Sequence, residues 1–484
     1  MIKALLKESS IYAIPTILVS LAGFFMLPVY TRVLTPADYG LLETVTKITD
    51  IFGLLLGAGI ADALVRFYST NDNQEQKQNI VVTAFSLIIF FSLAGGLLFA
   101  VLSRPLALFF LNSGNQRLLL ISFASVAVGL LLRISLTVYR CDSRAWLFAG
   151  VSIGMLVTQI AFNVIALFVF KLGVSGIILS TLIATALWSA ITIVPIYYKK
   201  RGAVNREWSG KLLSYGYPLV FAALAQFVLN FSDRFFLVRN TGMDALGIYS
   251  IAYRMGMLVT VVFSIVGQSW WPTVFRMAKE PDAVENLRRG NAIMTLLSAS
   301  ACVGVILFAK PLIDVMTTLQ FRSAYHLVPP IAAAYWIFCL VNGPLSVALK
   351  IRNRTGIFAV INVMSALFCL VLSFILIPKY GVWGAAYVTL LSFGFQLLPA
   401  CYWGYRCWPE LFDFLPIAAG LAGVAGAAAV TYTLSSVWYI ELPLRILALL
   451  VCGGGYAFFW VSRYGGGSVA DLKRLVFNSE TGVK

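Results

Sequence analysis

Long apolar segments recur at even intervals along the 484-residue chain. A helix needs about 20 apolar residues to cross the hydrocarbon core of a bilayer. Fourteen segments reach this length: 9–31, 40–66, 80–102, 117–139, 146–170, 174–198, 213–238, 245–272, 291–316, 327–349, 356–378, 380–404, 415–438 and 441–463. Their connections are no longer than about 20 residues, which is too short for a soluble catalytic domain. We therefore expect an all-α polytopic membrane protein with about 14 transmembrane helices, and we do not expect an enzyme.

The positive charge of the chain falls mainly on one side of these segments. Only 12% of the residues are charged, yet 36 lysines and arginines face 20 acids, a net charge of +16. In a soluble chain this excess would suggest nucleic acid, whereas cytoplasmic loops of membrane proteins are enriched in lysine and arginine. With the N-terminus inside, 23 of the cations are cytoplasmic and 9, including Arg445, are outside. We therefore expect both termini in the cytoplasm and no nucleic-acid partner.

The cysteine pattern does not indicate a metal site or a disulfide framework. All seven cysteines fall within spans or cytoplasmic connections, and no two form a Cys-x-x-Cys pair. Such pairs, or regular spacings in a secreted chain, are the usual signs of zinc binding or disulfides. We therefore expect neither a metal nor a bound cofactor.

The first twelve segments contain an internal duplication. Four patterns recur in order at offsets of 203–210 residues: Lys171–Gly176 with Lys379–Gly384, Tyr12-x-x-Pro15 with Tyr215-x-x-Pro218, Gly40 with Gly247, and Phe148-Ala149 with Phe358-Ala359. Six helices separate the copies, so they share one orientation, as in the parallel repeats of transporters. We expect a six-helix lobe over residues 1–200, a second over 201–406, two extra helices within 407–463 and a cytoplasmic tail at 464–484.

Eight ionisable residues lie inside predicted spans, where each costs about 2.5–3.5 kcal/mol at the bilayer centre. They are Glu43, Lys47, Asp50, Asp62, Arg133, Asp233, Arg234 and Arg254. The first three share one face of a helix because they are four and three residues apart. Leu54, Gly57, Ala61 and Asp62 extend that face. Two interpretations remain open: ion pairs that lock helices together, or the wall of a wet cavity. The planar guanidinium of arginine is also well suited to binding phosphate through two hydrogen bonds.

Several motifs resemble one known family. They are Leu27–Arg32, Leu34–Gly40, Gly57–Phe67, Asp233 and Gly247-Ile248-Tyr249. Together they resemble the lipid-linked oligosaccharide flippases of bacterial surface polysaccharide synthesis, the Wzx type. That family belongs to a superfamily that also holds multidrug-and-toxin extruders and lipid II flippases. The resemblance covers most of the chain. Many members have twelve spans, and fourteen is the count associated with lipid II flippases.

The resemblance implies a two-lobed bundle with alternating access, in the bacterial cytoplasmic (inner) membrane. It implies that undecaprenyl-diphosphate oligosaccharide moves from the inner to the outer leaflet, for O-antigen, capsule or exopolysaccharide. Cations that would then contact the headgroup are Lys47, Arg133, Arg234, Arg254 and Arg32. Carboxylates that would take a coupling H⁺ or Na⁺ are Glu43, Asp50, Asp62 and Asp233. Membrane lipid and polysaccharide polymerase machinery are the expected partners.

Three alternatives to this function remain. A multidrug extruder of the same superfamily usually carries a carboxylate in its first helix, and segment 9–31 contains none. A lipid II-type flippase shares the predicted number of spans. A membrane-embedded polymerase or ligase generally needs a large outer loop, and the outer connections of this chain are short.

Overall fold

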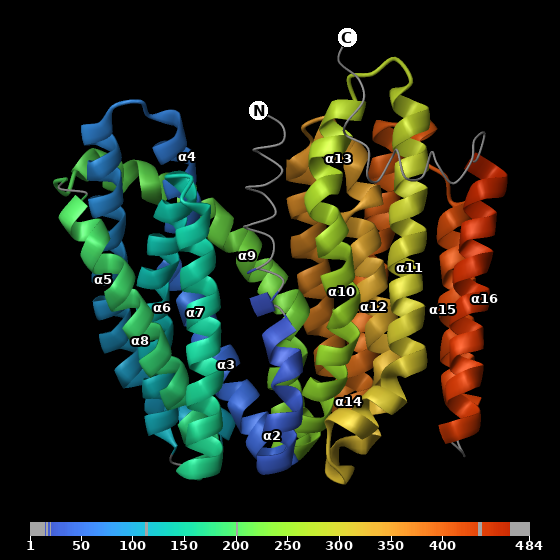
Figure 1. The fold of residues 1–484 in the computed structure, drawn as a ribbon, viewed down its shortest axis with the longest axis horizontal. Coiled ribbons are helices and arrows are strands. Elements are labelled where there is room, and N and C mark those ends of the chain that lie inside the picture. The colour runs from blue at the N-terminus through green and yellow to red at the C-terminus, as the bar shows by residue number, and fades with distance from the viewer. Residues whose placement is uncertain are drawn as a thin grey trace. The chain divides into compact units, whose positions relative to one another are not determined.

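In the computed structural model, residues 15, 18–19, 21–111, 115–199, 202–433 and 438–464 are described, and every regular element among them is a helix (Figure 1). In chain order the α-helices are α2 Leu27–Val33, α3 Pro36–Gly57, α4 Ile60–Thr70, α5 Gln74–Leu106, α6 Gln116–Cys141, α7 Ala145–Val164, α8 Gly173–Lys199, α9 Arg206–Thr241, α10 Met243–Met277, α11 Ala283–Met316, α12 Val328–Asn342, α13 Val347–Ile351, α14 Thr355–Cys407, α15 Leu415–Thr433 and α16 Trp438–Tyr464. Short π turns extend α5 and α7, and 3-10 turns flank α12 and precede α15.

The predicted spans are confirmed as helices. Within the described residues, twelve helices are long and apolar enough to cross a membrane, and a shorter apolar helix covers Leu21–Val33. The 53 residues of α14 contain two of the predicted spans, because Gly381 has non-helical angles (φ 54°, ψ −127°) and divides the helix there. The beginning of the first predicted span and residues 465–484 of the predicted tail lie outside the described residues. The chain is thus an all-α multi-pass membrane protein.

Local sequence determines where α3 begins. The Thr35 hydroxyl accepts a hydrogen bond from the backbone N–H of Asp38, and the Asp38 carboxylate accepts one from the N–H of Thr35. This capping box satisfies two N–H groups that have no partner inside the helix. Pro36 follows the cap at the first helical position, where its missing N–H is harmless. The Thr-Pro-Ala-Asp sequence is therefore a helix-start signal.

One predicted span is broken. The sequence indicates a continuous helix over 40–66, but the structure ends α3 at Gly57 and begins α4 at Ile60. Ala58 and Gly59 between them have positive φ angles of 43° and 64°. A Cβ on Gly59 would lie 2.5 Å from the carbonyl oxygen of Gly216 in α9, and one on Gly216 would overlap the carbonyl oxygen of Ala58. The break therefore occurs where two backbones touch.

Two duplicated glycines make a reciprocal contact. A Cβ on Gly40 in α3 would overlap the carbonyl oxygen of Met243, and one on Gly247 in α10 would overlap the carbonyl oxygen of Pro36. The offset of 207 that relates Gly40 to Gly247 also relates Pro36 to Met243. Each helix start therefore contacts the other in the same way, which is the relation expected between two parallel copies.

By its contacts the chain divides into two compact units. The first contains residues 1–250, 316–321 and 366–388, and the second contains 251–315, 322–365 and 389–484. This division places 201–250 in the first unit, whereas the duplication divides the chain after residue 200. A contact division and an internal repeat are different properties, so the lobes 1–200 and 201–406, with the extra helices at 407–463, stay a prediction.

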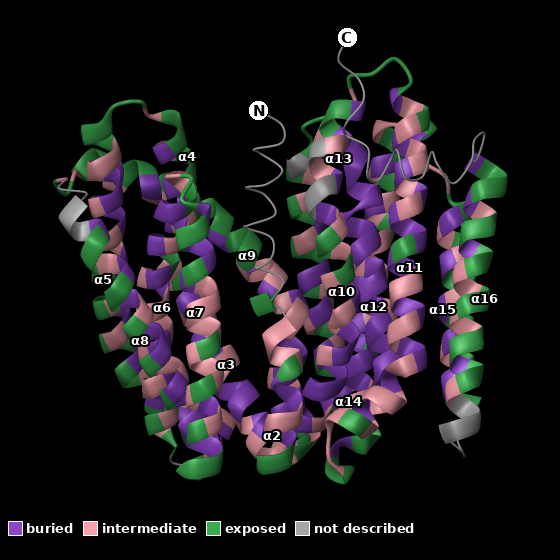
Figure 2. Cartoon of the chain, in the orientation of Figure 1, coloured by how far each residue is buried: buried purple, intermediate pink, exposed green. Residues whose placement is uncertain are grey.

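The second unit is built around α12. Figure 2 shows this helix as mostly buried, whereas α16 is largely exposed. Tyr335 of α12 packs edge-on against Tyr253 of α10, with ring centroids 5.3 Å apart, and 5.8 Å from the ring of Phe393 in α14. Trp336 packs over Gly420 of α15. A span buried on every side needs no polar face, and α12 carries no charge.

A buried arginine fastens α16 to α11. Pro311 lies inside α11 and has no N–H to donate to the carbonyl of Leu307 four residues earlier. The Arg445 guanidinium of α16 donates to that carbonyl instead. Arg445, counted from the sequence among the outer cations near the beginning of its span, therefore has a buried side chain that is 1% exposed. The charge of an isolated residue does not reveal that a proline on another helix has freed an acceptor for it.

Asp413, which lies between α14 and α15, fastens the other end of α16. Its carboxylate accepts hydrogen bonds from Arg463 Nε (2.9 Å), Arg288 (3.2 Å) and Tyr464, and from the N–H of Leu415. Burial alone would raise the pKa of Asp413, but the bonds from Tyr464, Arg463 and Leu415 outweigh it and lower the pKa to about 2.

Candidate functional site: a charged cavity in the first unit

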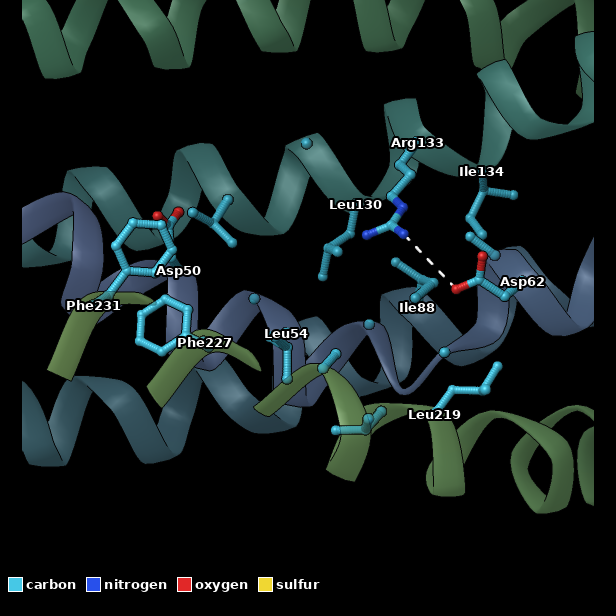
Figure 3. Close-up of a pocket in the computed structure, with 18 residues that line it drawn as sticks. Asp50, Leu54, Asp62, Ile88, Leu130, Arg133, Ile134, Leu219, Phe227 and Phe231 are labelled. Carbon is cyan, nitrogen blue, oxygen red and sulfur yellow. Dashed lines mark ion pairs between the residues drawn. The ribbon is translucent and has the colours of Figure 1, made fainter. Parts of the chain in front are cut away.

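Helices α3, α4, α5, α6 and α9 of the first unit enclose a cavity of about 460 Å³, which we call the charged cavity (Figure 3). Its lining residues are Asp50, Gly53, Leu54, Gly57, Gly59, Ala61, Asp62, Ile88, Val126, Gly129, Leu130, Arg133, Ile134, Leu219, Val220, Ala223, Phe227 and Phe231. All three ionisable members lie inside candidate membrane spans. The cavity is therefore a polar site at membrane depth with mainly apolar walls.

The wall formed by α3 and α4 follows from the sequence. Of the predicted stripe, Asp50, Leu54, Gly57, Ala61 and Asp62 line this cavity, whereas Glu43 and Lys47 at its beginning do not. The helix break at Ala58 and Gly59 interrupts that wall. Non-helical backbone at membrane depth is tolerated where it lines a cavity or is buried in protein. The cavity therefore accounts for both the helix break and the charges, because each is tolerated at membrane depth only away from lipid.

Arg133 and Asp62 face each other across the cavity. The guanidinium of Arg133 on α6 lies 3.9 Å from the carboxylate of Asp62 on α4, as the dashed line in Figure 3 shows. Their side chains are 63% and 60% exposed. A pair that is long and this exposed gains little energy from its contact. Arg133 can therefore exchange Asp62 for a ligand at small cost.

Lys47 and Asp50 form a tighter pair on α3. Their side chains meet at 2.7 Å, as the three-residue spacing predicts. The Lys47 ammonium also lies 4.5 Å from the centre of the Phe231 ring on α9. An aromatic face attracts a cation by its quadrupole. Asp50 lines the cavity, and Lys47 lies directly behind it.

Glu43 and Arg234 form a buried pair next to this group. Their side chains are 9% and 5% exposed and approach to 3.9 Å. Arg234 lies 4.7 Å from the ring of Phe231, so that ring contacts two cations. Neither Glu43 nor Arg234 lines the cavity. Glu43 and Arg234 therefore fit the ion-pair interpretation alone, whereas Asp50, Asp62 and Arg133 both form ion pairs and line the cavity.

The other predicted site residues lie apart from the cavity lining. Asp233 is 3% exposed and accepts a hydrogen bond from Tyr249, which joins two of the motifs quoted above into one bonded unit. Arg32 is exposed at the end of α2. Arg254 lies in the part of α10 that belongs to the second unit. Of the nine predicted residues, three therefore line the cavity, and the roles predicted for all nine in headgroup and ion binding stay predictions.

Sequence reasoning missed the aromatic wall of the cavity. Phe227 and Phe231 on α9 line it, together with Leu219. The available signal is the spacing of 227, 231 and 234, which places two phenylalanines and an arginine on one helix face. Apolar residues in a membrane helix also face lipid, so this spacing alone does not reveal which face lines a cavity.

Metal ligation finds no support in the described part of the chain. Across those residues, no three histidine, cysteine, aspartate or glutamate side chains gather as a metal ion would require. What the cavity offers a ligand is one accessible guanidinium, two carboxylates and two aromatic rings. Such a set can bind an anionic group and a small cation side by side.

Apolar helices of membrane-spanning length with a charged cavity among them define a polytopic membrane protein with an internal polar site. Residues 29–326, more than half of the chain, match the family described as polysaccharide biosynthesis protein. The chain belongs to this family. The resemblance to the oligosaccharide flippases is thereby confirmed.

Curated relatives extend over most of the chain. The lipid III flippase of Escherichia coli is 23% identical and covers 80% of this chain and 95% of its own. A putative O-antigen transporter of Shigella flexneri is 19% identical and covers 78% of this chain and 90% of its own. The solved structure of the lipid II flippase MurJ, in an inward closed conformation, has a TM-score of 0.73 at 16% identity. It covers 92% of this chain and 99% of that one, which shows the shared fold.

Proposed function

We propose that the protein is a flippase for undecaprenyl-diphosphate-linked oligosaccharide. It moves repeat units from the inner to the outer leaflet of the bacterial cytoplasmic membrane by alternating access, for O-antigen, capsule or exopolysaccharide. Family membership supports this proposal, as do relatives named as a lipid III flippase and an O-antigen transporter. Those relatives are named as transporters, in keeping with a protein that moves its substrate unchanged.

The observation that carries the proposal is the exposed guanidinium of Arg133 inside the charged cavity. Planar guanidinium groups bind phosphate by two parallel hydrogen bonds, and this one is held only by a weak pair with Asp62. The cavity volume of about 460 Å³ is in the range of small-molecule sites. In this proposal the diphosphate and adjoining sugar enter the cavity, and the isoprenoid tail stays in the bilayer.

Asp62 gives the same pair a second role. When Arg133 turns to the diphosphate, the carboxylate of Asp62 keeps its charge without that guanidinium beside it. Asp62 then takes up H⁺ or Na⁺, which neutralises the carboxylate. Asp50 takes no such part, because Lys47 holds it at 2.7 Å. Coupling by Asp62 thus links ion uptake to substrate binding.

An extruder of cationic drugs fits the cavity less well. Its binding site would have to accept a cation next to the accessible guanidinium of Arg133. Like charges in a site of low dielectric repel strongly. A lipid II-type flippase shares the fold, and it is distinguished by substrate alone.

Transport of lipid-linked oligosaccharide into vesicles tests the proposal. Arg133→Gln should lower the initial rate by about tenfold, the loss expected for one charge-assisted contact. Arg140→Gln is the matched control, because Arg140 lies on the same helix but packs over Phe148 outside the cavity. Wild-type rates in Arg133→Gln at equal protein levels would overturn the assignment.

Deletion in a host that depends on this protein separates a flippase from a polymerase. Loss of a flippase traps lipid-linked units in the inner leaflet, whereas loss of a polymerase leaves single units in the outer leaflet.

Reporter fusions at each end of the chain test its orientation in the membrane. We expect cytoplasmic signals from both, in agreement with the distribution of lysine and arginine.

A further inference from the structure

The first unit contains a second, larger hollow of about 760 Å³, which we call the interfacial pocket. It lies where α5 and α7 begin and where α6 and α8 end, so all of its walls meet at one end of the bundle. Its residues include Gln74 and Gln78 of α5, Asp142 and Arg144 of the turn between α6 and α7, and Trp146 of α7. None of these lines the charged cavity.

The pocket is polar at the helix ends and apolar farther in. Asp142 and Arg144 lie in the turn, beyond the candidate spans that end at Cys141 and begin at Ala145. Deeper in, Trp188 and Ile191 of α8 line it. These lie about 12–17 Å from the end of α8, at about 1.5 Å per residue. The pocket therefore changes from charged to apolar along the direction that crosses a membrane interface.

The outer wall of the pocket is open to lipid. Trp146 is 73% exposed, and Leu147 and Ile191 are each 48% exposed. Tryptophan at a helix end is typical of the membrane interface, where its ring lies among the lipid headgroups. Gly150 leaves the floor free, because a Cβ there would meet nothing within 4 Å. A lipid can enter such a pocket sideways, without leaving the bilayer.

The turn holds one anion and one cation two residues apart. Backbone bonds fix it: the N–H of Arg144 donates to the carbonyl of Tyr139 (2.8 Å), and Ser143 has a positive φ of 55°. Tyr68 donates its hydroxyl hydrogen to the carboxylate of Asp142 and holds it in place. A carboxylate and a guanidinium held in one rigid turn can bind a ligand that carries both a positive and a negative charge.

The duplication provides an internal comparison. The turn at Arg352, Asn353 and Arg354 has the same backbone, with a φ of 55° at Asn353 and a 2.8 Å bond from the N–H of Arg354 to Leu349. At offset 210, Asp142 corresponds to Arg352 and Arg144 to Arg354. The acid at 142 is thus not required by the turn itself.

We propose that the interfacial pocket binds a membrane phospholipid whose headgroup carries both a phosphate and a primary ammonium, of the phosphatidylethanolamine type. Arg144 and the amides of Gln74 and Gln78 bind the phosphate. Asp142 accepts hydrogen bonds from the ammonium. One acyl chain lies along Trp146 and Ile191. This site does not depend on the proposed function of the charged cavity.

Competition among lipids tests the site. The full chain is purified and offered equal amounts of phosphatidylethanolamine, phosphatidylglycerol and phosphatidylcholine, and the retained lipids are counted by native mass spectrometry. We expect phosphatidylethanolamine to be retained about tenfold over either competitor, because only it matches both charges with N–H donors. Equal retention of all three overturns the proposal. Preference for phosphatidylglycerol overturns it in favour of an anionic lipid.

Variants locate the bound lipid. Gly150→Leu fills the floor and should abolish the preference, and Gly210→Leu is the matched control, because Gly210 also has no atom within 4 Å of its Cβ but lies on α9 outside the pocket. Asp142→Asn and Arg144→Gln should each lower retention about tenfold. Tyr68→Phe keeps the Asp142 charge and should retain most of the binding. If Gly150→Leu, at an unchanged unfolding midpoint, keeps the preference, the lipid does not bind in this pocket.

Discussion

The charged cavity and the interfacial pocket, both in the first unit, each set an arginine near an acid against apolar walls. In the cavity these groups lie inside candidate membrane spans and on opposite helices, and a broken helix forms part of the wall. In the pocket they lie in one turn beyond the helix ends. Charged side chains inside a membrane span therefore depend on other helices for oppositely charged partners. Charged side chains at the membrane interface are stabilised by water and can lie in a single turn. Substitutions should affect the two places differently.

The largest difference should be in stability. Glu43→Gln removes the carboxylate charge that lies 3.9 Å from the buried Arg234 guanidinium, and breaking a buried pair costs about 3–5 kcal/mol. Arg144→Gln changes an exposed side chain and should shift the free energy of unfolding by less than about 0.5 kcal/mol. Thermal unfolding of the purified variants measures both. Equal midpoints for the two variants would show that depth does not govern the cost of removing a charge.

Glycine-to-alanine changes should also have opposite effects in the two places. Gly216→Ala puts a methyl group onto the carbonyl of Ala58 beside the charged cavity, a clash worth about 1–3 kcal/mol. Gly150→Ala meets nothing within 4 Å and should stabilise α7 by about 0.5–1 kcal/mol, because alanine favours helix over glycine. Unfolding midpoints check the signs. Stabilisation by Gly216→Ala would contradict the close approach of α9 to the helix break.

Function should separate in the same way. Arg133→Gln should lower transport about tenfold and leave phosphatidylethanolamine retention unchanged, and Arg144→Gln should lower lipid retention about tenfold. Transport by Arg144→Gln is measured in vesicles of fixed lipid composition, where we expect it to stay within about twofold of wild type. If both variants lose both properties together, the two places form one functional unit.

A separate effect concerns Asp413, in the second unit and outside both places. Its folded-state pKa of about 2 is below the ordinary 3.8, so its bonds to Arg463 and Tyr464 stabilise the fold above about pH 4. This contribution is lost as the pH falls from about 4 to 2. Asp413→Asn should therefore lower the unfolding midpoint at pH 6, and the difference from wild type should shrink at pH 2.5. A constant difference across that range would contradict the depressed pKa.

The sequence predicts the membrane spans better than it predicts the sites. Hydropathy predicts the spans because each must be apolar over its whole length, whatever its neighbours are. The stripe from Glu43 to Asp62 is likewise predicted, because polar side chains on one face of a membrane helix must avoid lipid, and it lines the cavity from Asp50 onward. By contrast, the exact place of the break depends on the approach of Gly216, 158 residues from Ala58, and the local sequence contributes only the flanking Gly57 and Gly59.

Partners in space explain the remaining errors. An arginine is typical of a loop, and the Leu307 carbonyl freed by Pro311 is the acceptor that accompanies the burial of Arg445. A phenylalanine is typical of a lipid-facing position, and the contacts of Phe231 with Lys47 and Arg234 make it part of the site. Arg254 fits the sequence pattern of an embedded cation as well as Arg133 does, yet only Arg133 lines the charged cavity.

The reciprocal glycine contact has a consequence for how such a chain arises. A contact in which Gly40 meets Met243 while Gly247 meets Pro36 is the pattern of an isologous interface, in which residue i touches j and j touches i. Two separate copies of a half-length chain would therefore pair through this same joint as a symmetric dimer. Joining them into one polypeptide keeps the joint but frees each half to change alone. The turn with Asp142 and its counterpart with Arg352 are an example: they share a backbone conformation but carry opposite charges.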